Sequence, residues 1–190
     1  SKSKNIKENH PLKPLTDYNK YKGLCEPVLF KYADKNFTTV VARPATLCGY
    51  SPRCRLDITV NILTNHAYHN KEIKIFGGDQ KRPNLHINDM CRAYLKLIQS
   101  SSKKVQKEVF NIGYRNLKIK QIAKIVKKTV EKFFKEQGKN QLISLTYTPS
   151  NDKRSYHINS DKIKRKLNFR PKYNIEDAVL DLCNAFKKKK

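Results

Sequence analysis

The chain has few acidic residues and no long apolar run. Among its 190 residues, 16 Asp and Glu stand against 41 Lys and Arg, which gives a formal net charge of +25. No stretch approaches the roughly 18 apolar residues that a membrane-spanning helix needs. Residues 1–10 are polar and charged, so we expect no signal peptide there. These absences predict a chain with no membrane partner.

Cysteine pairs with metal-ligand spacing are also missing. The chain has five cysteines, at positions 25, 48, 54, 91 and 183, and no two of them form Cys-x-x-Cys. An odd number of unpaired thiols is typical of a reduced, cytoplasmic protein rather than a disulfide scaffold. The spacings do not match those of zinc ligands, so we expect no metal site.

The strong positive charge has two interpretations. One is a basic nucleic-acid-binding module, in which clustered Lys and Arg neutralise phosphates. The other is a lysine-rich surface that carries no information about partners. The positive residues are mostly lysines spread over the whole chain, with no Arg-rich block. This spread favours the second interpretation, and nucleic-acid binding stays as the alternative of a different class.

Hydrophobic periodicity predicts alternating helices and strands. Apolar positions recurring at three and four residues indicate helices, and short β-branched runs indicate strands. Alternation of the two along a chain is typical of an α/β fold. We predict helices over 17–35, 57–70, 88–100, 118–137, 160–167 and from an N-cap at Asn174, with strands over 37–43, 72–76, 108–112 and 142–147 and a loop over 44–55. In the helix over 88–100, Met90, Tyr94, Leu97 and Ile98 should face inward.

The pair Tyr18 and Lys22 indicates acid–base chemistry. Four residues apart, the two side chains share one face of a helix. A nearby ammonium favours the phenolate, because positive charge stabilises the charged form of an acid. A tyrosine tuned in this way can exchange a proton with a sugar hydroxyl near neutral pH. The Tyr-x-x-x-Lys spacing also arises by chance in a lysine-rich chain, so the pair needs support from other motifs.

That support comes from a resemblance to the NAD-dependent sugar epimerase/dehydratase family. These enzymes are the extended short-chain dehydrogenases, which include UDP-glucose 4-epimerase. Segments similar to the family's C-terminal part occur in family order over nearly the whole chain. They are PLTDYNKYKGLCE at 14–26, VARPATLCGY at 41–50, FGGDQKRPNLHIND at 76–89, VFNIG at 109–113 and SDKIKRKLNFRPK at 160–172.

The resemblance implies a fold and an activity. The fold would be an incomplete doubly wound, Rossmann-like parallel sheet plus a smaller α/β substrate-binding region. Residues 1–48 would be the C-terminal remnant of the NAD-binding domain and 49–190 the substrate-binding region, with about 82–112 returning to the nucleotide-binding sheet. The activity would be NAD-dependent epimerisation of a nucleotide sugar, UDP-glucose 4-epimerase-like, with dehydration or reduction as alternatives.

The resemblance also assigns roles to particular residues. Tyr18 would be the catalytic acid/base, with Lys22 as its partner and as a contact to the nicotinamide ribose. Pro44 would lie under the nicotinamide. The residues implied for binding a nucleotide sugar, most plausibly a UDP-sugar, are Thr46, Asn61, Arg82 and Arg154. For His86 and Asp89 we expect a structural role, capping a helix near Asn88.

One motif of the family is absent. Its members open with a Gly-rich turn that seats the dinucleotide pyrophosphate at a helix N-terminus. The six glycines of this chain form no G-x-G-x-x-G or G-x-x-G-x-x-G pattern. We therefore expect a truncated chain that lacks most of its nucleotide-binding half and shows little turnover alone. A full-length version would be a homodimer whose interface uses the Tyr18 helix.

Overall fold

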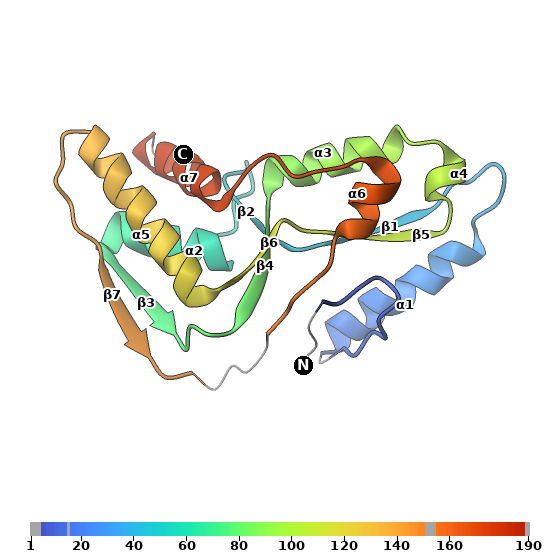
Figure 1. Ribbon diagram of the computed structural model, residues 1–190, viewed down its shortest axis with the longest axis horizontal. Coiled ribbons are helices and arrows are strands. Elements are labelled where there is room, and N and C mark those ends of the chain that lie inside the picture. Colours follow the sequence, from blue (N-terminus) through green and yellow to red (C-terminus); the bar gives the residue numbers. More distant parts are fainter. Residues whose placement is uncertain (1–4, 15, 151–154, 189–190) are drawn as a thin grey trace.

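The computed structural model describes residues 5–14, 16–150 and 155–188, which form an α/β structure with three small sheets (Figure 1). The helices are α1 (Asp17–Lys31), α2 (Thr59–Asn70), α3 (Ile87–Ile98), α4 (Ser102–Val105), α5 (Ile119–Glu136), α6 (Asp161–Leu167) and α7 (Ile175–Lys187). The strands are β1 (Val40–Pro44), β2 (Thr46–Cys48), β3 (Glu72–Phe76), β4 (Lys81–His86), β5 (Glu108–Ile112), β6 (Arg115–Lys118) and β7 (Ser144–Thr148).

Strands β1 and β5 form a parallel pair that carries helices on both sides. Helix α1 lies on one side of the pair, and α3 and α6 lie on the other (Figure 1). The outer edge of β5 is covered, because Lys162 of α6 donates to the Val109 carbonyl and Glu8 accepts from the Asn111 amide. Strand β1 pairs with β5 alone among the described residues, so its other edge faces the groove beside α1.

The predicted ends of α1 and β1 need correction. Helix α1 stops at Lys31, not residue 35, and β1 begins at Val40, not residue 37. Asp34 explains both shifts, since its carboxylate accepts hydrogen bonds from the amides of Asn36 and Phe37 and closes a turn there. A local side-chain bond of this kind offers the backbone an alternative to helix or strand.

The middle sheet consists of β2, β4 and β6, and the sequence predicted none of these three strands. Strand β4 pairs in parallel with β2 and antiparallel with β6. Strand β2 lies inside the stretch 44–55, which we expected to be a loop throughout, so that prediction was wrong in part. Polar residues and Pro83 obscure β4 in the sequence, and its pairing with two neighbours stabilises it instead.

A hydrophobic core lies between the β3–β7 pair and helices α2, α5 and α7. Strands β3 and β7 are parallel and in register from Glu72–Ser144 to Phe76–Thr148. Ile73 and Ile75 of β3 point into this core, where they meet the apolar face of α5. The prediction of α5 was confirmed to within one residue at each end, because its apolar positions repeat with helical spacing.

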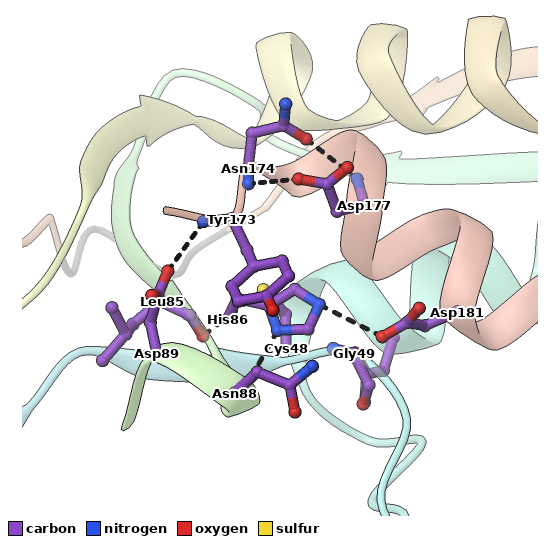
Figure 2. Close-up of polar contacts among 11 residues, drawn as sticks. Cys48, Gly49, Leu85, His86, Asn88, Asp89, Tyr173, Asn174, Asp177 and Asp181 are labelled. Carbon is purple, nitrogen blue, oxygen red and sulfur yellow. Dashed lines mark hydrogen bonds and ion pairs between the residues drawn. The ribbon is translucent and has the colours of Figure 1, made fainter. Parts of the chain in front are cut away.

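The N-caps of α1 and α3 precede the predicted residues by one and two positions, and the N-cap of α7 is the predicted one. The N-cap of α1 is Thr16 rather than Asp17, and its hydroxyl accepts from the Asn19 amide at 3.3 Å. The N-cap of α3 is His86 rather than Asn88. Asn174 does cap α7, and it exchanges two hydrogen bonds of 2.8 Å with Asp177 (Figure 2). This reciprocal arrangement satisfies two backbone donors at the helix start.

The inward face of α3 was predicted only in part. Met90 and Leu97 are buried as expected, but Tyr94 is 51% and Ile98 79% exposed. The buried stripe runs instead through Asp89, Met90, Ala93 and Leu97. The buried Asp89 carboxylate helps to determine which face of α3 points inward, because it accepts hydrogen bonds from the segment before α7.

Candidate functional site

Helix α1 presents Tyr18 and Lys22 on one face. The Lys22 ammonium lies 5.6 Å from the centroid of the Tyr18 ring. Both side chains are exposed, Tyr18 by 71%. The predicted sharing of one helix face is therefore confirmed. At this distance the cation interacts with the aromatic ring.

A groove of about 1100 Å³ separates α1 from β1. Lys22 and Glu26 line it from α1, while Arg43 and Pro44 line it from the end of β1. Apolar side chains cover much of the remaining wall, with Leu24, Val28, Leu29, Val40 and Ala42 among them. Tyr18 is not among the described lining residues and lies one helical turn before Lys22. The groove thus brings one member of the Tyr18–Lys22 pair next to Pro44.

An exposed ion pair lies in the loop before α2. Arg55 forms a two-pronged ion pair with Asp57, at 3.1 and 2.6 Å. The Asp57 carboxylate raises the pKa of Arg55, first through this hydrogen bond. Both side chains are largely exposed, so the pair contributes little to stability.

Pro44 and Thr46 mark the junction between two sheets. Pro44 is the exposed last residue of β1, and Ala45 donates to the Ile112 carbonyl at 2.7 Å. Thr46 begins β2, where it pairs with Asn84 of β4 and is half-buried. Pro44 lines the groove that Lys22 also lines, whereas Thr46, two residues further along, is not among its described lining residues.

Arg82 lies on β4 and is held by Tyr156. The Arg82 guanidinium carbon lies 5.5 Å from the centroid of the Tyr156 ring, and Arg82 also donates to the Lys81 carbonyl at 3.1 Å. Tyr156 also lines the groove beside α1, so it connects Arg82 to the groove that Lys22 and Pro44 line. Tyr156 was not predicted as a site residue, although it stands two residues from Arg154, a predicted ligand. Arg154 itself lies outside the described residues.

Asn61, which was predicted to contact the nucleotide, has a side chain enclosed by backbone groups. Its side chain is 1% exposed and is occupied by backbone groups: it accepts from the Gly49 amide at 3.1 Å and donates to the Arg55 carbonyl at 2.9 Å. These bonds fix the loop between β2 and α2. The geometry favours a structural role for Asn61 over a contact with the nucleotide.

His86 and Asp89 connect α3 to the segment that precedes α7 (Figure 2). The buried His86 ring accepts from the Asn88 amide at 3.1 Å, lies 3.2 Å from Asp181 and stacks on Tyr173 with centroids 4.8 Å apart. Asp89 is fully buried and accepts from the amides of Lys172 and Tyr173 at 2.9 Å. The expected helix-capping role of His86 is confirmed.

Metal sites and membrane spans are both absent from residues 5–14, 16–150 and 155–188. No group of three or more His, Cys, Asp or Glu side chains there is arranged to hold a metal ion. No helix in these ranges is long and apolar enough to cross a bilayer.

Solved structures similar to this chain include a UDP-glucose 4-epimerase from Thermotoga maritima with bound UDP-glucose. It is 25% identical, covers 100% of this chain and 59% of its own, and has a TM-score of 0.79. A UDP-glucuronic acid 4-epimerase from Bacillus cereus, with UDP-glucuronic acid and NAD, is 23% identical over 100% of this chain and 58% of its own, with a TM-score of 0.76.

A dTDP-glucose 4,6-dehydratase from Bacillus anthracis, in complex with NAD, is 22% identical. The match covers 99% of this chain and 57% of the dehydratase, with a TM-score of 0.73. The chain therefore spans less than two thirds of the length of these enzymes. The family model for the NAD dependent epimerase/dehydratase family matches residues 1–113, more than half of the chain. The fold and this match together place the chain in the NAD dependent epimerase/dehydratase family.

Proposed function

We propose that this chain supplies the acid–base pair and the substrate-binding half of an NAD-dependent nucleotide-sugar epimerase or dehydratase, with UDP-glucose 4-epimerase-like activity as the first choice. The observation that carries the proposal is the Tyr18–Lys22 pair on one face of α1, next to the groove that ends at Pro44. The similarity to solved epimerases supports it.

In this proposal each residue has a defined task. Tyr18 removes the proton from a sugar hydroxyl and later returns one, which is general acid–base catalysis. Lys22 keeps the phenol acidic enough to ionise. Thr46 hydrogen-bonds the sugar, and Arg82, held by Tyr156, pairs with the pyrophosphate through its planar fork of donors. When bound, NAD supplies the hydride chemistry.

The residues present fit only one end of the cofactor. Lys22 from α1 and Pro44 from β1 line the same groove, which suits the nicotinamide ribose and ring. The pyrophosphate would need a Gly-rich turn, and no such pattern occurs among the six glycines. We therefore propose that the pyrophosphate is held by a further nucleotide-binding half, and that this half takes the place beside the open edge of β1. A dimer through α1 remains part of the proposal for the longer protein.

The test is an assay of a protein that joins this chain to its nucleotide-binding half. Substrates are UDP-glucose, UDP-galactose, their N-acetyl forms and dTDP-glucose, with products resolved by chromatography. Tyr18→Phe should lower kcat by roughly 10²–10⁴-fold, the usual contribution of a positioned acid–base group. The matched control is Tyr94→Phe, which alters an exposed tyrosine on α3 and should keep the parent rate.

The outcomes separate the candidate activities. Conversion of UDP-glucose to UDP-galactose supports the epimerase, and loss of water from dTDP-glucose supports the dehydratase favoured by the Bacillus anthracis neighbour. Parent-like turnover by Tyr18→Phe would remove Tyr18 from its proposed role. The 190-residue chain assayed alone should show little turnover, and robust turnover would contradict the need for a further half.

A further inference from the structure

Helix α1 has an unusual attachment to the rest of the molecule. All of its residues are described, and none of them is buried. Exposed side chains include Tyr21, Leu24 and Val28, at 65%, 51% and 52%. Apolar burial therefore contributes little to fixing the helix. Something else must hold it if Tyr18 and Lys22 are to keep a defined orientation.

A forked ion pair provides that attachment. Arg43 of β1 donates from Nε to Glu26 Oε1 at 2.8 Å and from Nη2 to Glu26 Oε2 at 2.5 Å. Both side chains are shielded, with 23% and 17% of their surface exposed. Two parallel, charge-assisted hydrogen bonds fix both the distance and the relative orientation of the guanidinium and the carboxylate. Partial burial reduces the screening of their attraction by water and salt. The pair is thus a rigid connection between α1 and the sheet.

The same arginine also reaches the N-terminal segment. Its remaining terminal nitrogen, Nη1, donates to the Glu8 carbonyl at 3.0 Å, and the Glu8 side chain accepts from the Asn111 amide of β5. Arg43 is therefore the point at which residues before α1, α1 itself and the β1–β5 pair meet. Arg43 directly precedes Pro44 in the sequence, and both residues line the groove.

Glu26 completes a stripe along α1. Tyr18, Lys22 and Glu26 are spaced at four residues, so they follow one another on the same helix face. A carboxylate four residues after a lysine is also a natural ion-pair partner for that lysine. Because Arg43 takes both oxygens of Glu26, the Lys22 charge stays directed toward Tyr18.

We infer that the Glu26–Arg43 pair is a positioning pair: it sets α1 against the Pro44 end of β1 and keeps the Glu26 charge away from Lys22. The positional half of this inference stands on the contacts alone. The electrostatic half rests on the proposed function, because it concerns the ionisation of Tyr18. The other titratable side chains lining the groove are Lys13, Tyr21, Cys25, Tyr32 and Tyr156.

The positional half is tested by hydrogen exchange on the 190-residue chain. Glu26→Gln and Arg43→Gln should each speed exchange of the α1 amides at least about tenfold while leaving α5 and α7 unchanged. Arg43→Lys, which keeps the charge but not the fork, should fall between them and the parent. The matched control is Glu131→Gln, which breaks the half-buried pair with Lys127 on α5 and should not affect α1. Unchanged α1 exchange in both Gln variants would overturn the inference.

The electrostatic half is tested by the turnover of the protein that includes the nucleotide-binding half. Arg43→Gln leaves the Glu26 anion free to pair with Lys22, which should lower kcat at least about tenfold. Glu26→Gln leaves Lys22 without a competing anion and should lower kcat less. The double variant should turn over faster than Arg43→Gln alone.

The outcomes distinguish this inference from the proposed function. A purely structural pair would lower kcat equally in Arg43→Gln, Glu26→Gln and the double variant, and that result would refute the electrostatic half. If the parent has no turnover, the proposed function fails with it, and the exchange of α1 still decides whether the pair positions the helix.

Discussion

The ammonium of Lys22 lies 5.6 Å from the ring centroid of Tyr18, and both residues project from a helix with no buried residue. The pair therefore depends on the surroundings of α1 for its orientation and on solvent for part of its screening. Contacts between α1 and its neighbours therefore bear directly on the geometry of the pair.

Removing the Lys22 charge should slow the proposed proton transfer. Lys22→Met removes the cation beside the Tyr18 ring, and with it a positive charge that would stabilise negative charge developing on the phenol oxygen during proton transfer. We expect at least about a tenfold loss of kcat, measured on the protein that includes the nucleotide-binding half. Lys20→Met, on another face of α1, is the control and should keep the parent rate. A parent-like kcat in Lys22→Met would argue against Lys22 as the partner of Tyr18.

Replacing the buried acid of α3 should destabilise the fold. Asp89→Asn leaves the two amides of Lys172 and Tyr173 with one acceptor oxygen between them and removes the charge facing Arg92. We expect a loss of roughly 1–3 kcal/mol in the free energy of unfolding, measured by urea denaturation. Glu136→Gln, in an exposed pair with Lys132, should change it by less than about 0.5 kcal/mol. Equal effects of the two would show that Asp89 is not a structural anchor.

A methyl group at Gly113 should clash with Ile158. A Cβ built there lies 2.7 Å from Ile158 Cδ1 and 3.3 Å from Ala45 Cβ. Because Ile158 Cδ1 is the far end of a half-buried side chain that can turn aside, Gly113→Ala should cost about 0.5–1.5 kcal/mol, the cost of an off-rotamer side chain. Combining it with Ile158→Val removes the clashing carbon, so the two changes should be less harmful together than their sum. Strict additivity in thermal unfolding would contradict this contact.

The five thiols should differ sharply in reactivity. Burial raises the pKa of Cys48 and of Cys183 to about 12, so only about one molecule in 10⁴ is thiolate at pH 8 for each. Cys25 and Cys91 are exposed. Iodoacetamide followed by peptide mass spectrometry should label Cys25 and Cys91 first and reach the buried pair only in denaturant. Early labelling of Cys183 would indicate that α7 opens readily.

Local patterns predicted the elements that carry their own signal. Helix α5 and strands β3 and β5 follow from regular apolar spacing, and the cap of α7 follows from Asn174. Strand β4 has no such signal, since Lys81, Arg82 and Pro83 favour neither alternation nor helix. It exists because β2 and β6 pair with it on both edges, and pairing with distant segments cannot be read from a local window.

The candidate site divides in the same way. Tyr18 and Lys22 could be predicted because one short sequence motif contains both residues. The Glu26–Arg43 fork joins residues 17 positions apart, and Tyr156 reaches Arg82 from across 74 positions. Neither contact leaves a trace in the spacing of residue types. The backbone contacts of Asn61 could not be predicted either, because they depend on its burial and not on its residue type.

The open side of β1 has a practical consequence for handling the polypeptide. A strand edge with no strand partner among the described residues, bordered by exposed leucine and valine side chains, is a template for self-association. We expect the 190-residue chain to self-associate increasingly as its concentration rises, unless a protein covers that strand. Light scattering during refolding, with and without such a protein, would reveal how much of the self-association the β1 edge causes.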